Sequence, residues 1–593
     1  MFSKNSYTMK SVYKNILLII SLVISTSCVD IERYEDGRIS YDEIFQNDKK
    51  TAGYLNRCYS YLEAFGTQYP GSTMLAAYCD ESHDTNDVLH GAASNWQKGQ
   101  LTPYYNPIEN GYELWGHYWG GIHYCNVFLD NIDEANLRSE LDRNSWRAQA
   151  YALRAFYYLQ LIKRFGAVPI ATKPYDKNFD YTQLKKNTFA ECAQQILSDC
   201  DKALEATDEE LMWRAGNAEN DKGKFSKAVV HAIRSQTALY AASPLWKDGD
   251  FGWKEAAKIT KESLDACLAH GYELFRHQPA GNQGYSPYDL YFLTPMEVTG
   301  GNDRETIYET GGRMNLYRYH GLPIVNGFER VGISPSQELI DAYETIDGKQ
   351  PILGYKDANH LNPIINAEAT LYDESKPYIN RDPRLMASIY YNGSRHNLND
   401  PNSFVWTQVG GNCGIKPYSS MNTRTGYYLR KYTHFESNKN ANKDGIFKLY
   451  RLAELYLNAA EAINEATEGD VAPKEAVDAI NSVRSRVGMK ALPMGISKDD
   501  FRKRVRNERR VELAFEEHRF FDVRRWNILD QTDKVVTGMK AENLGGTIKY
   551  TRFAVDNNRK AYSDKYLRLP IPGDEVIRLK KLTGINFQNP GWN

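Results

Sequence analysis

Apolar side chains recur at helical spacing along much of the chain. Stripes at intervals of three and four residues predict six helices in the first half, over residues 39–65, 112–135, 146–164, 188–206, 224–242 and 253–270. Within 146–164, alanines lie among large aromatic residues such as Tyr151, Phe156 and Tyr157. Small residues set against large ones let two helices approach closely and interlock. We therefore expect the first half of the chain to be helical and closely packed.

Two further helices are predicted nearer the C-terminus. One apolar stripe runs from Leu452 to Ile463, and the next helix begins at Pro473 and ends before Gly488. Proline at the start and glycine at the end of a helix is the expected asymmetry. Helices of this length with interleaved alanine and tyrosine are typical of tetratricopeptide-type pairs, although no segment matches that consensus closely. The predicted fold class is mostly α, built of helix pairs.

Residues 507–526 combine a helical apolar stripe with many charges. The stripe predicts one core-facing helix and consists of Val511, Ala514, Phe515, His518 and Phe521. Opposite charges three or four residues apart form four possible pairs, Arg504–Glu508, Arg509–Glu512, Glu516–Arg519 and Asp522–Arg525. A solvated helix would gain only about 0.2–0.5 kcal/mol from each pair. We favour the alternative, a partly buried network that fixes how neighbouring elements dock.

The helical pattern stops between about residues 278 and 444. Glycine, proline, asparagine and tyrosine dominate this segment, with turn signals at Asn392-Gly393 and Gly410-Gly411-Asn412. A segment of this length that carries so many aromatic residues is not one disordered loop. The sequence predicts a large irregular, loop-rich insert over 276–444, and loops on a rigid scaffold are where binding residues concentrate.

The first 27 residues resemble a bacterial lipoprotein signal. Lys10 and Lys14 precede a nine-residue, largely apolar run over 16–24, and Cys28 ends the segment. This run is too short to cross the hydrocarbon core of a membrane, which takes about 20 residues. We expect a signal peptide over 1–27 and lipidation of Cys28. Cleavage to a free secreted protein is the alternative, and the start stays open between Met1 and Met9. An acidic tether over 28–38 follows, with Asp30, Glu32, Glu35 and Asp36.

Composition narrows the function classes. The chain has 593 residues, with 73 basic and 75 acidic side chains and a formal net charge of -2, so it lacks the positive footprint of a nucleic-acid binder. Its 42 tyrosines and 10 tryptophans suit both wet binding sites and helix packing. The eight cysteines include no C-x-x-C pair, and we expect most of them to be small core residues.

No catalytic or metal-binding motif is complete. H-E-x-x-H, G-x-S-x-G and G-x-G-x-x-G are absent. Asp248-Gly249-Asp250 lacks the other oxygen ligands of a calcium loop, and the glycines between Gly216 and Lys224 have the wrong spacing for a phosphate loop. A glycosidase needs two carboxylates, which could come from Asp80, Glu81, Asp84 and Asp87. We nevertheless favour binding over catalysis and expect no metal and no cofactor.

The run Glu508-Arg509-Arg510-x-Glu512-Leu513-x-Phe515-Glu516-x-x-Arg519-x-x-Asp522-x-x-Arg525-Trp526 resembles a family hallmark. It is similar to the signature near the C-terminus of SusD/RagB outer-membrane nutrient-binding lipoproteins. WGHYWGGIHYCNVFLDNI, RAFYYLQLIKRFGAVPI and RLAELYLNAAEAINEA also look like family landmarks. The resemblance implies about four helix pairs interrupted by the insert, with the hallmark as scaffold. It divides the chain into an N-terminal region, 39–275, and a C-terminal domain, 276–593, made of the insert, scaffold helices over 445–530 and a last segment over 531–593.

The same resemblance implies a function. SusD-like proteins are non-catalytic lipoproteins of the outer membrane that face the cell exterior, and the acidic tether resembles their export signal. We expect this chain to bind an oligosaccharide or polysaccharide and to deliver it to a SusC-like TonB-dependent transporter, without contact to nucleic acid. A peptide-binding RagB-like uptake lipoprotein is one alternative. A repeat scaffold that binds only the transporter is another.

The candidate ligand residues come from two regions. A sugar ring has an apolar face and a rim of hydroxyl groups, so its binder needs an aromatic platform with polar groups around it. The loop after residue 80 supplies Asn86, Asp87, His90, Asn95 and Trp96, and the insert supplies Tyr285, Tyr288, Tyr291, Arg313, Tyr317, Tyr319 and Trp406. The resemblance implies that these regions meet at the ligand surface. Trp96 is our best single candidate, as a solvent-facing platform; the alternative is that such aromatics pack the insert onto the helices.

Overall fold

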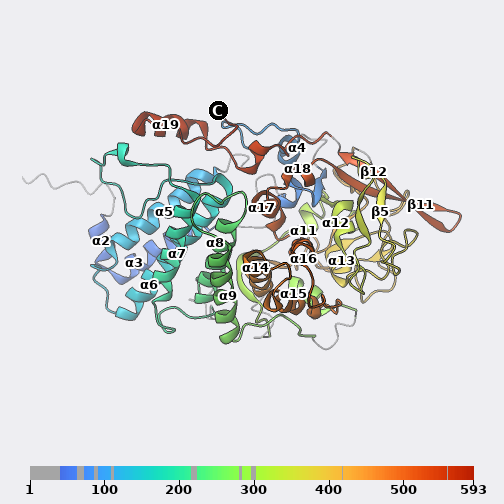
Figure 1. The fold of residues 1–593 in the computed structure, drawn as a ribbon, viewed down its shortest axis with the longest axis horizontal. Coiled ribbons are helices and arrows are strands. Elements are labelled where there is room, and N and C mark those ends of the chain that lie inside the picture. Colours follow the sequence, from blue (N-terminus) through green and yellow to red (C-terminus); the bar gives the residue numbers. More distant parts are fainter. Residues whose placement is uncertain are drawn as a thin grey trace, which may run out of the picture.

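The computed structural model describes residues 40–62, 73–85, 91–108, 113–214, 223–278, 284–294, 302–416, 418–556 and 558–592. The expected signal peptide, the lipidation site Cys28 and the acidic tether lie outside these residues. Figure 1 shows helices α2, α3 and α5 to α9 at one end of the molecule, the insert with its short strands at the other, and α14 to α17 between them.

The helices of the first half follow the predicted segments. They are α2 (Tyr41–Phe45), α3 (Asp48–Tyr59), α5 (Leu114–Asn131), α6 (Glu140–Phe165), α7 (Phe189–Leu204), α8 (Lys227–Ala242) and α9 (Trp253–Ala269). Side-chain caps decide where several of them begin. The Ser139 side chain accepts a hydrogen bond from Asp142 N, which starts α6 before the predicted residue 146. Asn47 caps Lys50 N in the same way and separates α3 from α2, so the predicted helix over 39–65 is two helices.

Each long helix packs against the next one along the chain. This order runs from α5 through α6, α7 and α8 to α9. Helix α9 then packs against α14 (Leu452–Ala466), which in turn contacts α15 (Lys474–Arg486) and α16 (Lys498–Glu512), so the helical array continues across the insert. The prediction of a mostly α fold is confirmed, while the tetratricopeptide character of the pairs stays a prediction.

The insert contains short helices and short strands, and most of these strands pair with one another. The helices are α10 (Pro287–Leu293), α11 (Leu316–Tyr319), α12 (Gln337–Ala342) and α13 (Pro383–Ser388). The strands are β2 (Thr306–Arg313), β3 (Ile333–Pro335), β4 (Ile352–Tyr355), β5 (Pro363–Ile365), β6 (Ile389–Tyr390), β7 (Ser394–Arg395), β8 (Phe404–Val405) and β9 (Tyr428–Leu429). Every sheet in the described part of the chain has two strands, and β2 pairs with β10 (Ile446–Arg451), which leads directly into α14.

An antiparallel ladder joins the loop after residue 80 to the insert. Strand β1 (Ser82–Asp84) pairs with β3, with Ser82 opposite Pro335 and Asp84 opposite Ile333. The ladder continues through Thr85 N, which donates to Gly332 O at 3.0 Å. The two regions expected to form the ligand surface are therefore held together by backbone hydrogen bonds.

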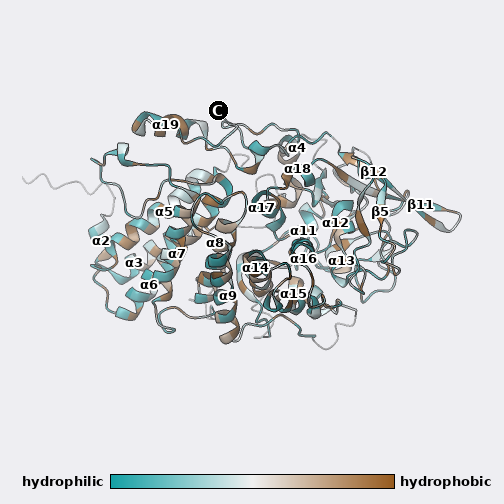
Figure 2. Cartoon of the chain, in the orientation of Figure 1, coloured by the Kyte–Doolittle hydropathy of each residue, from teal (hydrophilic) through white to brown (hydrophobic). Residues whose placement is uncertain are grey.

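The predicted single helix over residues 507–526 is wrong. Helix α16 ends at Glu512, and α17 (His518–Arg525) begins after a five-residue break. Within the break Phe515 and Glu517 adopt left-handed backbone angles, φ 59° and 67°, which an α-helix cannot contain. Figure 2 shows α16 and α17 as mainly hydrophilic helices even though they lie in the middle of the molecule.

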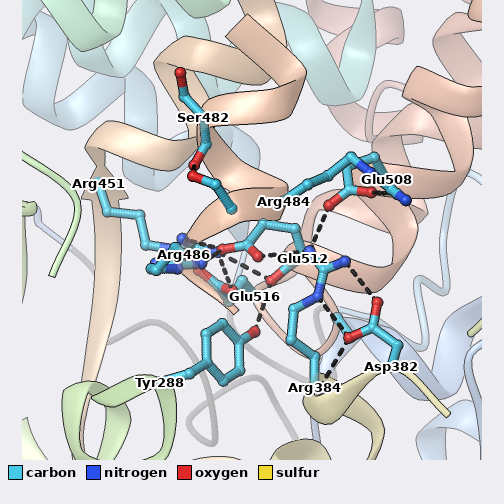
Figure 3. Close-up of polar contacts among 12 residues, drawn as sticks. Tyr288, Asp382, Arg384, Arg451, Ser482, Arg484, Arg486, Glu508, Glu512 and Glu516 are labelled. Atoms are coloured by element: carbon cyan, nitrogen blue, oxygen red, sulfur yellow. Dashed lines mark hydrogen bonds and ion pairs between the residues drawn. The ribbon is translucent and has the colours of Figure 1, made fainter. Parts of the chain in front are cut away.

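Three of the four predicted local ion pairs are also wrong, because the charged groups reach distant elements instead. Only Asp522–Arg525, at 2.7 Å, forms as expected. Glu512 contacts Arg384 at 2.9 Å, Arg451 at 2.6 Å, and Arg486. Figure 3 shows Glu512 in the centre of these groups.

The interpretation as a buried network is confirmed. Glu512 and the three arginines around it are almost fully buried. The connected ion pairs contain six cations, Arg384, Lys431, Arg451, Arg484, Arg486 and Arg504, and six anions, Glu305, Glu344, Asp382, Glu508, Glu512 and Glu516. These residues come from the insert, β10, α15, α16 and, for Glu516, the break after α16. The network therefore joins the insert to the helical scaffold, and its positive and negative charges are equal in number.

The last part of the chain returns to the first helices. After α18 (Leu529–Thr532), a hairpin of β11 (Val536–Leu544) and β12 (Thr547–Asp556) is followed by η5 (Asp564–Leu567) and α19 (Gly573–Thr583). Figure 1 shows α19 above α5, at the end of the molecule opposite the hairpin. Asn589 Nδ2 donates to Phe165 O and to Leu569 O, both at 2.7 Å, which ties the C-terminal segment to the end of α6.

Candidate functional site

Trp96 is a core residue, so the prediction of a solvent-facing platform is wrong. Its side chain is 0 % exposed on α4 (Ala92–Gln97). The indole lies edge-on to Tyr78 and Tyr566, with ring centroids 5.9 and 5.5 Å away, and the Arg524 guanidinium lies 5.6 Å from the ring centroid. Tyr78 lies nearby in the sequence on η1 (Leu75–Tyr78), whereas Tyr566 on η5 and Arg524 on α17 lie more than 400 residues away. The Trp96 side chain therefore packs its loop against the C-terminal part of the chain.

The other loop candidates divide into two groups. Asn95 is partly exposed, and its Nδ2 donates to the Tyr105 hydroxyl at 2.8 Å. Asn86, Asp87 and His90 lie outside the described residues, so their role stays a prediction.

The acidic residues considered for glycosidase chemistry are built into the interior. Asp80, Glu81 and Asp84 are all buried. Both carboxylate oxygens of Asp80 accept hydrogen bonds from Arg519, each at 2.8 Å, so this carboxylate joins its loop to α17. Asp87 lies outside the described residues.

Tyr285, Tyr288 and Tyr291 are also buried, and their assignment to the ligand surface is wrong. The Tyr288 hydroxyl donates to Glu512 O at 3.1 Å and accepts a hydrogen bond from Lys431 Nζ at 3.0 Å, so it belongs to the charge network. Tyr285 stacks on Phe435 with ring centroids 5.6 Å apart. Tyr288 thus attaches the insert to the scaffold, which is the alternative for such aromatics, whereas Tyr285 packs within the insert.

The structure carries four of the insert candidates at its surface: Arg313, Tyr317, Tyr319 and Trp406, which we call the insert face. A small second core supports two parts of it. Tyr317 packs against this core, and Val405, next to Trp406, is one of its buried members. Trp406 is 37 % exposed and stacks on Phe404, with ring centroids 5.2 Å apart. Phe404 is not among the ligand residues predicted from the sequence, although it lies only two residues from Trp406.

Polar contacts hold the first part of the insert face in place. The Asp444 carboxylate accepts hydrogen bonds from Tyr317 N at 2.9 Å and His434 N at 3.0 Å, and Arg313 donates to Asp444 O at 2.8 Å. Burial raises the pKa of Asp444 to about 6, against the effect of those backbone donors. The segment that carries Tyr317 is thus fixed by backbone contacts that leave its ring partly exposed.

Tyr319 lies in a cationic surrounding. The guanidinium groups of Arg318 and Arg330 lie 5.0 and 5.5 Å from its ring centroid, and Arg318 also pairs with Glu329 at 2.6 Å. A guanidinium group this close to an aromatic ring is attracted to the negative face of that ring. The residues of the insert face thus include tyrosine and tryptophan rings as well as a guanidinium group.

The described residues provide no obvious metal site. Among them, no group of three or more histidine, cysteine, aspartate or glutamate side chains is arranged to hold a metal ion. Asp248, considered for calcium, instead caps α7 by accepting hydrogen bonds from Phe189 N at 2.6 Å and Ala190 N at 3.0 Å. The seven cysteines in the described ranges are free and buried, as expected for core residues. Within those ranges, helices of sufficient length and apolarity to span a membrane were not found.

Comparison with known proteins gives two family matches. Residues 302–592 match the model of the SusD family, and residues 46–215 match a model described as "Starch-binding associating with outer membrane". SusD-like protein P2 of Formosa agariphila is 23 % identical, and the alignment covers 97 % of this chain and 99 % of that protein.

Solved structures share the fold over nearly the whole chain. A SusD-like protein from Bacteroides fragilis superimposes with a TM-score of 0.73 at 24 % identity, covering 93 % of this chain and 98 % of the other. A structure described as a laminarin-binding SusD-like protein gives a TM-score of 0.55 at 21 % identity, covering 92 % and 100 %.

Proposed function

We propose, from the premise that this chain belongs to the SusD/RagB family, that it is a non-catalytic cell-surface lipoprotein that captures oligosaccharides. It delivers them to a SusC-like TonB-dependent transporter in the outer membrane. The family match carries this proposal. One matching model is described as starch-binding and associating with the outer membrane, and one solved relative as laminarin-binding, which supports a glycan as the ligand.

The insert face has the chemistry that this ligand class needs. Sugars stack their apolar face on aromatic rings and place hydroxyl groups against charged or amide side chains. Trp406 and the partly exposed Tyr317 and Tyr319 supply rings, and Arg313 supplies a guanidinium group. Arg313, Tyr317, Tyr319 and Trp406 are therefore the proposed ligand residues, and Asn86, Asp87, His90 and Asn95 remain proposed for the adjoining loop.

Isothermal titration of the mature chain tests the proposal. The probes are uncharged hexasaccharides, hexagalacturonate and a mixed peptide pool, each titrated separately. Trp406→Ala and Tyr319→Ala should weaken glycan affinity about 5- to 150-fold, which corresponds to a stacking contribution of about 1–3 kcal/mol by analogy with bases on aromatic side chains. Tyr418→Ala is the matched control, because Tyr418 is an insert tyrosine that is 86 % exposed.

The outcomes separate the alternatives. Binding of the peptide pool but of no glycan would replace the proposal by peptide uptake. Absence of binding to every pool, with co-purification of the transporter intact, would favour a scaffold for the transporter alone. Unchanged glycan affinity in both insert-face variants would show that the ligand lies elsewhere.

A further inference from the structure

A cleft of about 450 Å³ lies between the start of α5 and the C-terminal helix α19. This volume is within the usual range of about 300–1,000 Å³ for small-molecule sites. Trp115 and Trp119 on α5, and Tyr175 and Tyr181 from the segment after α6, line it. None of them belongs to the insert face.

Two indole rings form a rigid inner wall. Trp115 is almost fully buried and meets the Phe165 ring edge-on at 5.2 Å, and Trp119 meets the Tyr158 ring edge-on at 5.9 Å. Phe165 and Tyr158 are core residues of α6. Because Trp115 and Trp119 are four residues apart on one helix, both rings lie on the same helix face, and their orientation is set before any ligand arrives.

The opposite wall is held as firmly. Leu579 of α19 is buried in the cleft lining. After α19, Phe587 O accepts a hydrogen bond from Lys186 Nζ at 3.0 Å. Asn589, two residues further on, is hydrogen-bonded to the end of α6. Before α19, Leu569 N donates to Arg164 O at 2.9 Å. Helix α19 is thus anchored on both sides, and the cleft between it and α5 is a built feature of the fold.

The tyrosines lie towards solvent. Tyr175 is 39 % exposed and stacks on Phe179 with ring centroids 4.1 Å apart, and its ring lies 5.9 Å from that of Tyr181. The cleft therefore passes from the buried Trp115 indole, past the partly exposed rings of Trp119 and Tyr181, to the exposed phenol ring of Tyr175. A ligand with both an apolar face and hydroxyl groups matches this gradient.

The charged groups of the lining determine which sugars fit. Arg578 donates two hydrogen bonds to Glu575, at 2.8 and 2.6 Å, so its charge is already neutralised. Glu113 adds a second carboxylate, so the two carboxylates and the one guanidinium group of the lining have a formal net charge of -1. A carboxylate or sulfate on a sugar would meet net repulsion here, whereas an uncharged sugar would not.

We propose that this cleft is a second carbohydrate-binding site, selective for uncharged oligosaccharides. The inference takes its ligand class from the proposed function, but it concerns a different surface. Its aromatic walls would stack the sugar rings, and the carboxylates of Glu113 and Glu575 would accept hydrogen bonds from sugar hydroxyl groups.

Titration of the mature chain with maltohexaose, laminarihexaose, mannohexaose and hexagalacturonate tests this site. One variant, Tyr175→Ala, removes the exposed stacking ring. Another, Gly116→Phe, fills the cleft from α5, where the atoms nearest to an added Cβ belong to the flexible Glu113 side chain, the closest at 3.0 Å. Tyr41→Ala is the matched control, since Tyr41 is a 48 % exposed tyrosine of the helical half outside the cleft. Thermal unfolding verifies that each variant is folded.

We expect an uncharged hexasaccharide to bind at two sites, the insert face and the cleft. Affinity for the cleft should fall at least fivefold in both cleft variants and should be unchanged in Trp406→Ala and Tyr41→Ala. Loss of all binding in the cleft variants, with the insert-face variants unaffected, would also support the cleft and would reassign the main site. Glycan binding that both cleft variants leave unchanged would overturn this inference and leave the proposed function standing. Absence of any glycan binding would overturn both, and equal cleft binding of hexagalacturonate would overturn the selectivity.

Discussion

Replacement of Glu512 by glutamine tests whether the buried charge network holds the two halves of the protein together. The substitution keeps the size of the side chain, so it leaves no cavity. It removes one of the six anions of the network, and Arg384, Arg451 and Arg486 lose their shared carboxylate. Burial by itself would raise the pKa of Glu512, but Arg486, Arg451 and Arg384 together hold it well below its usual value. The native protein therefore depends on the ionised form.

The expected loss of stability follows from the burial. Breaking a fully buried ion pair costs about 3–5 kcal/mol, because the remaining charge stays buried without compensation. An unfolding entropy of about 2.1 cal/mol/K per residue gives roughly 1.2 kcal/mol/K for a chain of 593 residues that unfolds as one unit. Glu512→Gln should then lower the Tm by about 2–4 °C and shift the urea midpoint in the same direction.

Thermal and urea unfolding at pH 7 measure this loss. Glu468→Gln is the matched control, because Glu468 pairs with Lys254 at a similar 2.6 Å but both side chains are about 80 % exposed. We expect no measurable shift in the control, since exposed pairs contribute little. The sign with pH follows from the lowered pKa of Glu512: its contribution is complete above the unfolded value of about 4.3 and is lost as the pH falls through the folded value. The gap between native and Glu512→Gln proteins should therefore narrow below about pH 4. Equal urea midpoints at pH 7 would refute the reasoning.

Three other predictions follow from the structure and the sequence. Trp96→Ala should lower the free energy of unfolding by about 3–5 kcal/mol, because it leaves a cavity, while glycan affinity per folded molecule is unchanged. Urea unfolding and titration measure the two effects, and weaker affinity at native stability would contradict the assignment of Trp96 to the core. Burial raises the pKa of Glu81 to about 8, so its contribution to stability is complete below the unfolded value of about 4.3 and declines as the pH rises towards 8. Glu81→Gln should therefore gain up to roughly 3 kcal/mol relative to the native protein at pH 7 but not at pH 4, and a pH-independent difference in urea unfolding would speak against this. Cys28→Ala should abolish incorporation of a labelled fatty acid and release the protein from the membrane fraction, whereas equal labelling would exclude Cys28 as the lipidated residue.

Local pattern was enough to locate the long helices. The predicted segments 224–242 and 253–270 correspond closely to α8, Lys227–Ala242, and α9, Trp253–Ala269. Helix formation depends on side chains three and four residues apart and on caps within the first turn, and these relations are visible in the sequence. The hallmark motif was equally visible, which is why the family resemblance could be stated from the sequence.

Burial and ion pairing depended on residues that the sequence does not place next to one another. Trp96 was predicted as an exposed platform because its sequence neighbours are polar, but its partners Phe520 and Tyr566 lie more than 400 residues away. Spacing alone pairs Glu512 with Arg509, whereas in the fold Glu512 contacts Arg384, Arg451 and Arg486, which lie on other elements. The cleft under α19 combines the first long helix with the last one. Helical periodicity determined the scaffold, and the tertiary packing of distant segments decided which aromatic and charged side chains reach the surface.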